Sequence, residues 1–291
     1  MTIKEVETLA GKIFYPRAKK SSISENHLIG LDEQRKTLEV FCQFVWSEDW
    51  QKKSKVLHFM STILLYGPPG TGKTSLLMDV ANSFGSNQVK YYRESLDLLI
   101  DKELGETSKL IKNLFDTIIE QSKCGQKVFL QLDDIDSVLS SRFISNESSG
   151  IKRAVNTFLI QLDELLQSNL VNPPIIAATT NMFSHLDSAI KRRFSLKMEI
   201  EPLLSQKELE ELLQPIINLI GGELEINFKE IETIVKQKEL TPHDMIVVAQ
   251  RVFLSHLVGN KINFEQFIKE LSSSESSKVS FSQQRRSFSA I

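Results

Sequence analysis

The chain has 291 residues, of which 41% are hydrophobic and 25% are charged, and its formal net charge is -2 at pH 7. This length supports a substantial buried core without disulfide or metal staples, and the composition excludes a disordered or collagen-like chain. The nearly balanced charge argues against a general binder of polyanions, so we do not expect a nucleic-acid partner.

No stretch of the sequence approaches the roughly 18 consecutive apolar residues of a membrane-spanning helix, and the first residues lack the apolar core of a secretory signal. We therefore expect a cytoplasmic protein without a membrane span. The two cysteines, Cys42 and Cys124, do not form a CxxC pair. Two buried structural thiols are expected rather than a disulfide or a zinc site.

Strand-like and helical segments alternate over the first two thirds of the chain, which predicts an α/β fold with a parallel sheet and crossover helices. An amphipathic, aromatic-rich segment near Leu38–Val45 is expected to pack in the core. The strand-like runs are Ile63–Tyr66, Val89–Tyr92, Val128–Leu132, Ile175–Ala178 and Leu196–Ile200.

After Pro202 the strand-like runs stop and helix-start signals follow one another. These signals are Ser205 with Glu208, Asn227, Thr241 with Pro242 and Asp244, and Asn263. We predict an irregular segment at 1–26, a large α/β domain at 27–200, a small all-helical lid at 201–271 and a disordered serine-rich tail at 272–291.

A phosphate-binding motif lies between the first strand-like run and a helix. The run Gly67-Pro68-Pro69-Gly70-Thr71-Gly72-Lys73-Thr74 satisfies the pattern GxxxxGK[ST]. Its glycines let backbone N–H groups surround a phosphate, while Lys73 reaches the β- and γ-oxygens and the Thr74 hydroxyl can ligate Mg²⁺. The pattern therefore predicts a site for ATP and magnesium.

A second anchor for the metal follows the run Val128–Leu132, which ends in Asp133 and Asp134. Carboxylates at the carboxyl end of a parallel strand face the ligand edge of the sheet. We expect Asp133 to hold the hydration shell of Mg²⁺ and Asp134 to act as the general base that polarises the attacking water.

Together these motifs resemble the AAA family of ATPases over residues 28–200, since the family's phosphate loop also reads GPPGTGKT. The segment Ala177–Asn181 resembles the first sensor of the family, which implies that Asn181 helps to place the water. By the same likeness, Ile29 and Gly30 line the adenine pocket. The P-loop sheet followed by a helical lid is the fold that the resemblance implies.

The segment Leu186–Phe194 is similar to the second region of homology in the vacuolar-sorting, katanin and spastin branch of the family. That likeness makes Arg192 and Arg193 arginine fingers that act on a neighbouring subunit, and it implies a homo-oligomer, a hexameric ring. The alternative is a surface basic cluster that complements the dipole at a helix C-terminus.

Three features depart from the family pattern. Aspartate at Asp134 replaces the usual glutamate, and its shorter reach predicts slow hydrolysis if nothing compensates. Glu103 stands where the family's protein-threading loop has an aromatic residue. No second-sensor arginine is found in the lid, where His243 lies inside a helix cap.

The favoured function is an Mg²⁺-dependent ATPase that assembles into a ring and uses ATP to remodel or disassemble a protein partner, whose identity stays open. The alternative is a nucleotide-gated regulatory scaffold with slow hydrolysis, which Asp134 and Glu103 favour. A DNA-handling loader has the same fold, but the sequence lacks a basic stripe for it.

Overall fold

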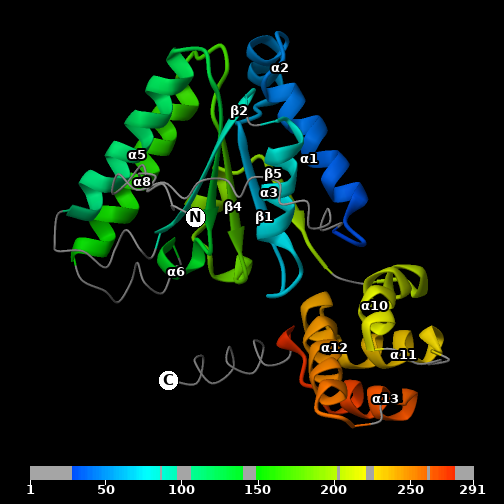
Figure 1. The fold of residues 1–291 in the computed structure, drawn as a ribbon. Coiled ribbons are helices and arrows are strands. Elements are labelled where there is room, and N and C mark those ends of the chain that lie inside the picture. Colours follow the sequence, from blue (N-terminus) through cyan, green and yellow to red (C-terminus); the bar gives the residue numbers. More distant parts are fainter. Residues whose placement is uncertain are drawn as a thin grey trace, which may run out of the picture. The chain divides into compact units, whose positions relative to one another are not determined.

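The computed structural model describes residues 28–85, 87–96, 106–139, 149–201, 204–220, 226–260 and 263–278. These residues divide into two compact units, both drawn in Figure 1. The first, here the sheet unit, comprises Glu33–Tyr66 and Thr74–Glu199. The second, here the helical unit, comprises Leu28–Asp32, Gly67–Lys73 and the residues from Ile200 onward. The phosphate loop is thus grouped with the helices, whereas the predicted domain 27–200 assigned it to the sheet.

The sheet unit is built on a parallel sheet whose five strands, among the described residues, have the order β2-β3-β4-β1-β5. Three of the predicted apolar runs form strands that are largely buried, β1, β3 and β4, as expected for strands covered on both faces. The strands are β1 (Thr62–Tyr66), β2 (Val89–Ser95), β3 (Lys127–Asp133), β4 (Ile175–Thr180) and β5 (Leu196–Glu199).

Helices cover both faces of this sheet. In Figure 1, α1 (Asp32–Val45) and α3 (Lys73–Ser83) lie on one side, and α5 (Glu106–Lys123) and α8 (Ser149–Gln167) lie on the other. The short elements are α2 (Trp50–Leu57), α6 (Asp136–Leu139), η1 (Phe183–His185) and α9 (Ser188–Arg192). None of the described helices is long and apolar enough to cross a membrane.

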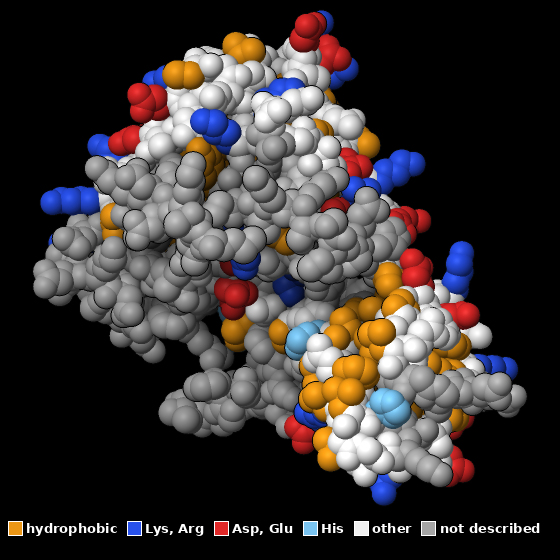
Figure 2. Space-filling model, viewed as in Figure 1, with side chains coloured by type: hydrophobic (Ala, Val, Ile, Leu, Met, Phe, Trp, Pro, Cys, Tyr) orange, Lys and Arg blue, Asp and Glu red, His pale blue; other side chains and the backbone are white. Residues whose placement is uncertain are grey.

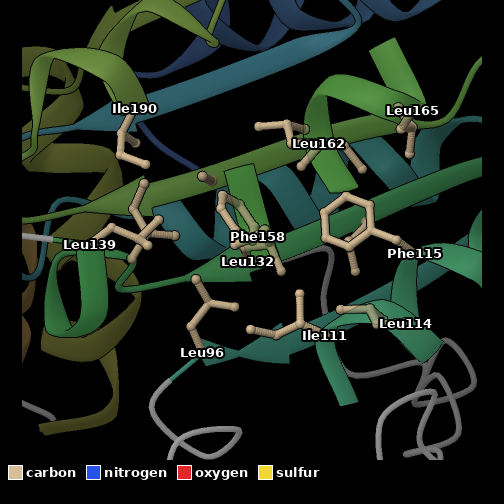
Figure 3. Close-up of a cluster of buried hydrophobic side chains, with 14 of the residues drawn as sticks. Leu96, Ile111, Leu114, Phe115, Leu132, Leu139, Phe158, Leu162, Leu165 and Ile190 are labelled. Carbon is tan, nitrogen blue, oxygen red and sulfur yellow. The ribbon is translucent and has the colours of Figure 1, made fainter. Parts of the chain in front are cut away.

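The main core of the sheet unit lies between α5, α8 and the strands. Figure 3 shows Phe115, Leu132 and Phe158 pointing into one cluster of buried side chains. The rings of Phe115 and Phe158 meet edge to face, with centroids 5.7 Å apart. This packing holds β3, and with it the predicted carboxylates, in a fixed position.

The aromatic-rich helix α1 packs as predicted, because Leu38, Phe41 and Val45 are buried. The prediction for the cysteines is half wrong. Cys42 is buried in α1, but Cys124 is exposed. Cys124 follows the last residue of α5 and precedes Gly125, whose φ of +83° turns the chain at the surface.

The helical unit contains α10 (Gln206–Ile220), α11 (Phe228–Lys238), α12 (Pro242–Leu257) and α13 (Phe264–Ser273), which form the predicted helical lid. The predicted helix starts are confirmed: Asn227 caps α11, and Thr241 and Asn263 each begin a capping box. Figure 2 shows exposed hydrophobic side chains on this unit. The most exposed in α10 and at the end of α12 are Leu219, Leu254, Leu257 and Val258.

The prediction of a disordered tail is wrong for residues 272–278, which the structure describes. α13 continues to Ser273, and Ser276 is 4% exposed. The Ser277 N–H and hydroxyl donate to the carboxylate of Asp244 in α12. Hydrogen bonds to that buried acid therefore replace the apolar contacts that the segment lacks. Residues 279–291, like the predicted segment 1–26, lie outside the described part.

Candidate nucleotide-binding site

The phosphate loop connects the end of β1 at Tyr66 to the start of α3 at Lys73. Gly67 has a φ of +148°, and a Cβ added there would lie 2.3 Å from the carbonyl oxygen of Ile200. Gly70 has a φ of +77°. Only glycine takes both conformations without strain, so the motif's glycines are required by the backbone of the loop.

The side chain of Lys73 lies against the phosphate loop. Its side chain is nearly buried, and its Nζ donates to the carbonyl oxygens of Gly67, at 2.9 Å, and Pro68, at 2.6 Å. A phosphate oxygen carries more negative charge than these carbonyls and binds an ammonium group more strongly. The lysine is therefore placed to exchange loop carbonyls for a phosphate.

The fold brings together the predicted magnesium residues Thr74 and Asp133, which are 59 positions apart in the sequence. The Thr74 hydroxyl donates to Oδ1 of Asp133 at 3.2 Å. A hydroxyl that donates to a carboxylate keeps a lone pair for a metal ion. Hydroxyl and carboxylate oxygens are the ligands that Mg²⁺ prefers.

Two residues beside Asp133 were not identified from the sequence. Gln131, fully buried in β3, donates to Oδ1 of Asp133 at 2.8 Å and accepts from the Tyr91 hydroxyl at 2.8 Å. Arg93 in β2 donates from Nε to Oδ2 of Asp133 at 2.5 Å. A polar residue inside the apolar run Val128–Leu132 was the available signal for Gln131.

Asp134 and Asn181 also meet, as the predicted base and sensor should. The side-chain amide of Asn181 donates to Oδ1 of Asp134 at 3.0 Å. Asp134 is exposed and has a φ of +47°. Aspartate is among the non-glycine residues that adopt this left-handed conformation most readily, so the turn after β3 suits it. The carboxylate and the amide can share one polarised water.

Asp136 connects the start of α6 to the end of β4 through hydrogen bonds. Its Oδ1 accepts hydrogen bonds from the Thr180 hydroxyl at 2.5 Å and from the Asn181 backbone N–H at 3.2 Å. The end of β4 is thereby tied to the segment after β3. This contact fixes Asn181 beside Asp134.

Arg192 lies at the opposite edge of the sheet from these groups. Asp133 is the last residue of β3, Asn181 follows the last residue of β4, and Thr74 contacts Asp133 at this carboxyl edge, whereas Arg192 precedes β5. Arg192 also lines a depression with Ser61 and Pro173, which precede β1 and β4. A strand of five residues spans about 15 Å, so Arg192 is remote from the phosphate-binding edge of its own chain.

Arg193 has a partner within its own chain. Its Nε and Nη2 donate to the two carboxylate oxygens of Asp163 in α8, each at 2.7 Å, and its Nη1 donates to the Ala189 carbonyl. The hydrogen bond with Asp163 raises the pKa of Arg193. Among the described residues Arg192 has no hydrogen bond or ion pair and is exposed.

Lid residues approach the phosphate loop within the helical unit. A Cβ added at Gly70 would lie 2.8 Å from both Thr241 Oγ1 and His243 Cβ. His243, which the sequence assigned to a helix cap, therefore also borders the loop. Gly30 lies against Leu204, and Ile29 packs on the helical core. The predicted adenine-pocket residues are thus in the same unit as the loop.

These residues fit a magnesium nucleotide. Mg²⁺ is usually held by one or two carboxylates and hydroxyls together with phosphate oxygens, rather than by a protein cage. The described residues contain no group of three or more His, Cys, Asp or Glu that could hold a metal by themselves. Glu103 of the predicted pore loop lies outside the described residues.

Residues 63–202 match the family described as "ATPase family associated with various cellular activities (AAA)". The fold is similar to that of a chain in the HORMA:CdnC:Trip13 complex of E. coli MS115-1, with a TM-score of 0.71 and 20% sequence identity. This similarity covers 85% of the present chain and 89% of that chain. It also resembles the FIGL-1 AAA domain in complex with ADP, with a TM-score of 0.63, 22% identity, and 85% of this chain and 83% of that chain covered.

Sequence relatives point to one branch. Fidgetin-like protein 1 of Drosophila melanogaster is 30% identical over 179 residues, which are 62% of this chain and 31% of the relative. Vacuolar protein sorting-associated protein 4A of Homo sapiens is 37% identical over 138 residues, 47% of this chain and 30% of the relative. The A-like 1 form of the katanin p60 ATPase-containing subunit, from Papio anubis, is 30% identical over 227 residues, 76% of this chain and 44% of the relative.

The chain therefore spans less than half of the length of these curated relatives. The match covers the phosphate loop, the carboxylate strand and the two arginines, and the parallel sheet with its helical lid agrees with the AAA structures. The chain contains an AAA ATPase domain of the vacuolar-sorting and katanin branch.

Proposed function

We propose that the chain is an Mg²⁺-dependent ATPase that assembles into a ring, hexameric by family resemblance, and uses ATP to remodel a protein partner. The observation that carries the proposal is that the phosphate-facing residues and Arg192 lie at opposite edges of the sheet, so that each group forms one half of a site. The groups that face phosphate lie at the carboxyl edge of the sheet, and the exposed Arg192 lies at the opposite edge. A second copy of the chain is needed to bring the two halves together.

Each residue has a role in this proposal. Lys73 and the loop N–H groups bind the β- and γ-phosphates, and Thr74 and Asp133 hold magnesium. The bound Mg²⁺ supplies positive charge that offsets the charge of the phosphate oxygens. Asp134 accepts a proton from the attacking water, which Asn181 orients.

Arg192 completes the site of a neighbouring subunit. Charge on the transferred phosphoryl group needs an external cation, and an arginine supplied by a partner typically contributes about 10³- to 10⁵-fold in rate. Because Asp163 holds Arg193, we assign Arg193 to positioning α9 and the adjacent Arg192. The location in the cytoplasm and the protein substrate stay predictions.

Phosphate release measured over a range of protein concentrations tests the proposal. The rate per subunit should rise with concentration, and light scattering should show a larger oligomer with ATP than without it. Asp134→Asn keeps the size of the side chain and the tolerance for positive φ, so it should bind ATP but lose about 10²- to 10⁴-fold in turnover. A monomer with a concentration-independent rate would contradict the ring.

A nucleotide-gated scaffold is the second candidate, and the short carboxylate of Asp134, already bonded to Asn181, favours it. In this case ATP binding changes the assembly while hydrolysis is slow. Asp134→Glu should then raise turnover sharply, because the longer side chain reaches the water. A fast wild-type rate would exclude this candidate.

A further inference from the structure

Both oxygens of the Asp133 carboxylate accept hydrogen bonds from other side chains. Its Oδ1 accepts from three groups, the Thr74 hydroxyl, the Gln131 amide and the Thr179 hydroxyl, at distances between 2.8 and 3.2 Å. Its Oδ2 accepts from Arg93. Each carboxylate oxygen has two lone pairs, so Oδ1, with three donors, is saturated, and a hydrated metal ion must use Oδ2, to which the Arg93 guanidinium is bound.

Strand pairing explains why Arg93 reaches this oxygen. β2 and β3 are parallel neighbours, with Arg93 opposite Gln131 and Ser95 opposite Asp133. Side chains two residues apart share a face of the sheet, so Tyr91 and Arg93 meet Gln131 and Asp133 on one face. Tyr91 bonds to Gln131, and Arg93 bonds to Asp133. The ion pair is thus part of an ordered row of polar contacts.

We propose that Arg93 is a latch on the metal site, a positioning residue that occupies Oδ2 of Asp133 and must be displaced when Mg²⁺ binds with nucleotide. The inference rests on the proposed magnesium site. Two cations at one carboxylate oxygen repel each other, so the metal and the guanidinium compete for that oxygen. The Arg93 side chain is 53% exposed and can turn into solvent, whereas Asp133 is 9% exposed and stays in place.

The latch has two consequences. It pairs a largely buried carboxylate with a positive charge, which lowers the cost of keeping that charge in the protein. It also weakens the affinity for the metal, since binding must first break a charge-assisted hydrogen bond. Binding of Mg²⁺ is therefore coupled to breaking the hydrogen bond between Arg93 and Asp133.

Direct metal titration tests the latch without relying on turnover. The full chain is stripped of metal with a chelator and mixed with less than one equivalent of ADP. Mn²⁺ is then added, and free Mn²⁺ is read by electron paramagnetic resonance. Arg93→Gln should bind Mn²⁺ about 3- to 10-fold more tightly than the wild type, which is the fold-change expected for one partly exposed ion pair.

Lys90→Gln is the matched control, because Lys90 is an exposed cation of the same strand whose odd spacing from Arg93 places it on the other face. It should stay within about twofold of the wild type. Arg93→Met, which keeps the apolar stem of the side chain, should repeat the effect of Arg93→Gln. Thermal unfolding of each variant checks that it is folded.

An Arg93→Gln affinity equal to that of the wild type would overturn the latch. A weaker affinity would also overturn it, because Arg93 would then support the bound phosphates. Asp133→Asn separates this failure from failure of the proposed function. If ADP does not bind, or if Asp133→Asn binds Mn²⁺ as tightly as the wild type, the magnesium site itself is wrong and the latch falls with it.

Discussion

Arg193 donates two hydrogen bonds of 2.7 Å each to the carboxylate of Asp163 in α8. The adjacent Arg192 is exposed and, within the described part of the chain, unpaired. Two consecutive arginines of one motif thus have different physical roles. Arg193 fixes the end of α9 to α8, and the side chain of Arg192 is exposed to solvent.

Arg193→Ala should lower the free energy of unfolding by about 1–2 kcal/mol, because it breaks a forked pair whose two side chains are only partly exposed. Arg192→Ala should change it by less than about 0.5 kcal/mol. Urea unfolding measures both. Asp163→Ala should resemble Arg193→Ala, and the double variant should lose less than the sum of the single losses. Additive losses would show that the pair contributes nothing.

Thr74→Ala should weaken the affinity for Mn²⁺ in the ADP complex by about 10- to 100-fold, because it removes a metal ligand and a hydrogen bond to Asp133. Thr74→Ser keeps the hydroxyl and should remain near the wild-type affinity. Calorimetric titration of ADP without metal should be nearly unchanged in both variants. Equal metal affinities for the alanine and serine variants would remove Thr74 from the site.

The helix cap formed by Ser205 and Glu208 at the start of α10 should stabilise the lid by an amount that depends on pH. Hydrogen bonds from the Ser205 hydroxyl and backbone N–H lower the pKa of Glu208 in the folded chain. Its contribution to stability is therefore present above the unfolded-state pKa of about 4.3 and is lost as the pH falls through the lower folded-state value.

Glu208→Ala should accordingly cost about 1 kcal/mol at pH 7 and less as the solution becomes more acidic than about pH 4. Glu208→Gln retains a capping group without a titrating proton, so its stability difference from the alanine variant should not vary with pH. Chemical unfolding at several pH values gives these differences. A cost of Glu208→Ala that does not change with pH would contradict the ionised cap.

The two thiols should react at very different rates. Cys124 is exposed, whereas Cys42 is buried and its pKa is raised by burial and by the nearby Glu39. A thiol-disulfide reagent at neutral pH should therefore modify one cysteine rapidly and the second only after denaturation. Cys124→Ser should abolish the fast phase. Two fast phases in the folded wild type would contradict the burial of Cys42.

Local signals were sufficient to predict the strands, the phosphate loop and the helix caps. A glycine pattern between an apolar run and a helix specifies its own geometry, and the capping residue of a helix lies within three positions of its partner. For this reason the sequence indicated the loop that Lys73 contacts, and it predicted the caps at Asn227 and Thr241, which the structure contains.

Contacts between distant segments could not be predicted in the same way. The polar Gln131 indicated a partner but not that it is Tyr91, and the pairing of Arg93 with Asp133 depends on the β2–β3 register. The apolar pattern of a strand does not specify which strand pairs with it. The bond of Ser277 to Asp244, for the same reason, was not expected in a serine-rich tail.

The central claim is that each ATP site combines one chain's carboxyl edge with the next chain's Arg192. Mixing two inactive variants tests it most directly, by phosphate release at fixed total protein. Arg192→Ala keeps the phosphate-binding residues, and Asp134→Asn keeps the arginine, so the mixture should turn over ATP faster than either variant alone. A mixture of Arg192→Ala with the Arg192→Ala/Asp134→Asn double variant should not recover. If the first mixture shows only the average of its two components, Arg192 does not act across subunits.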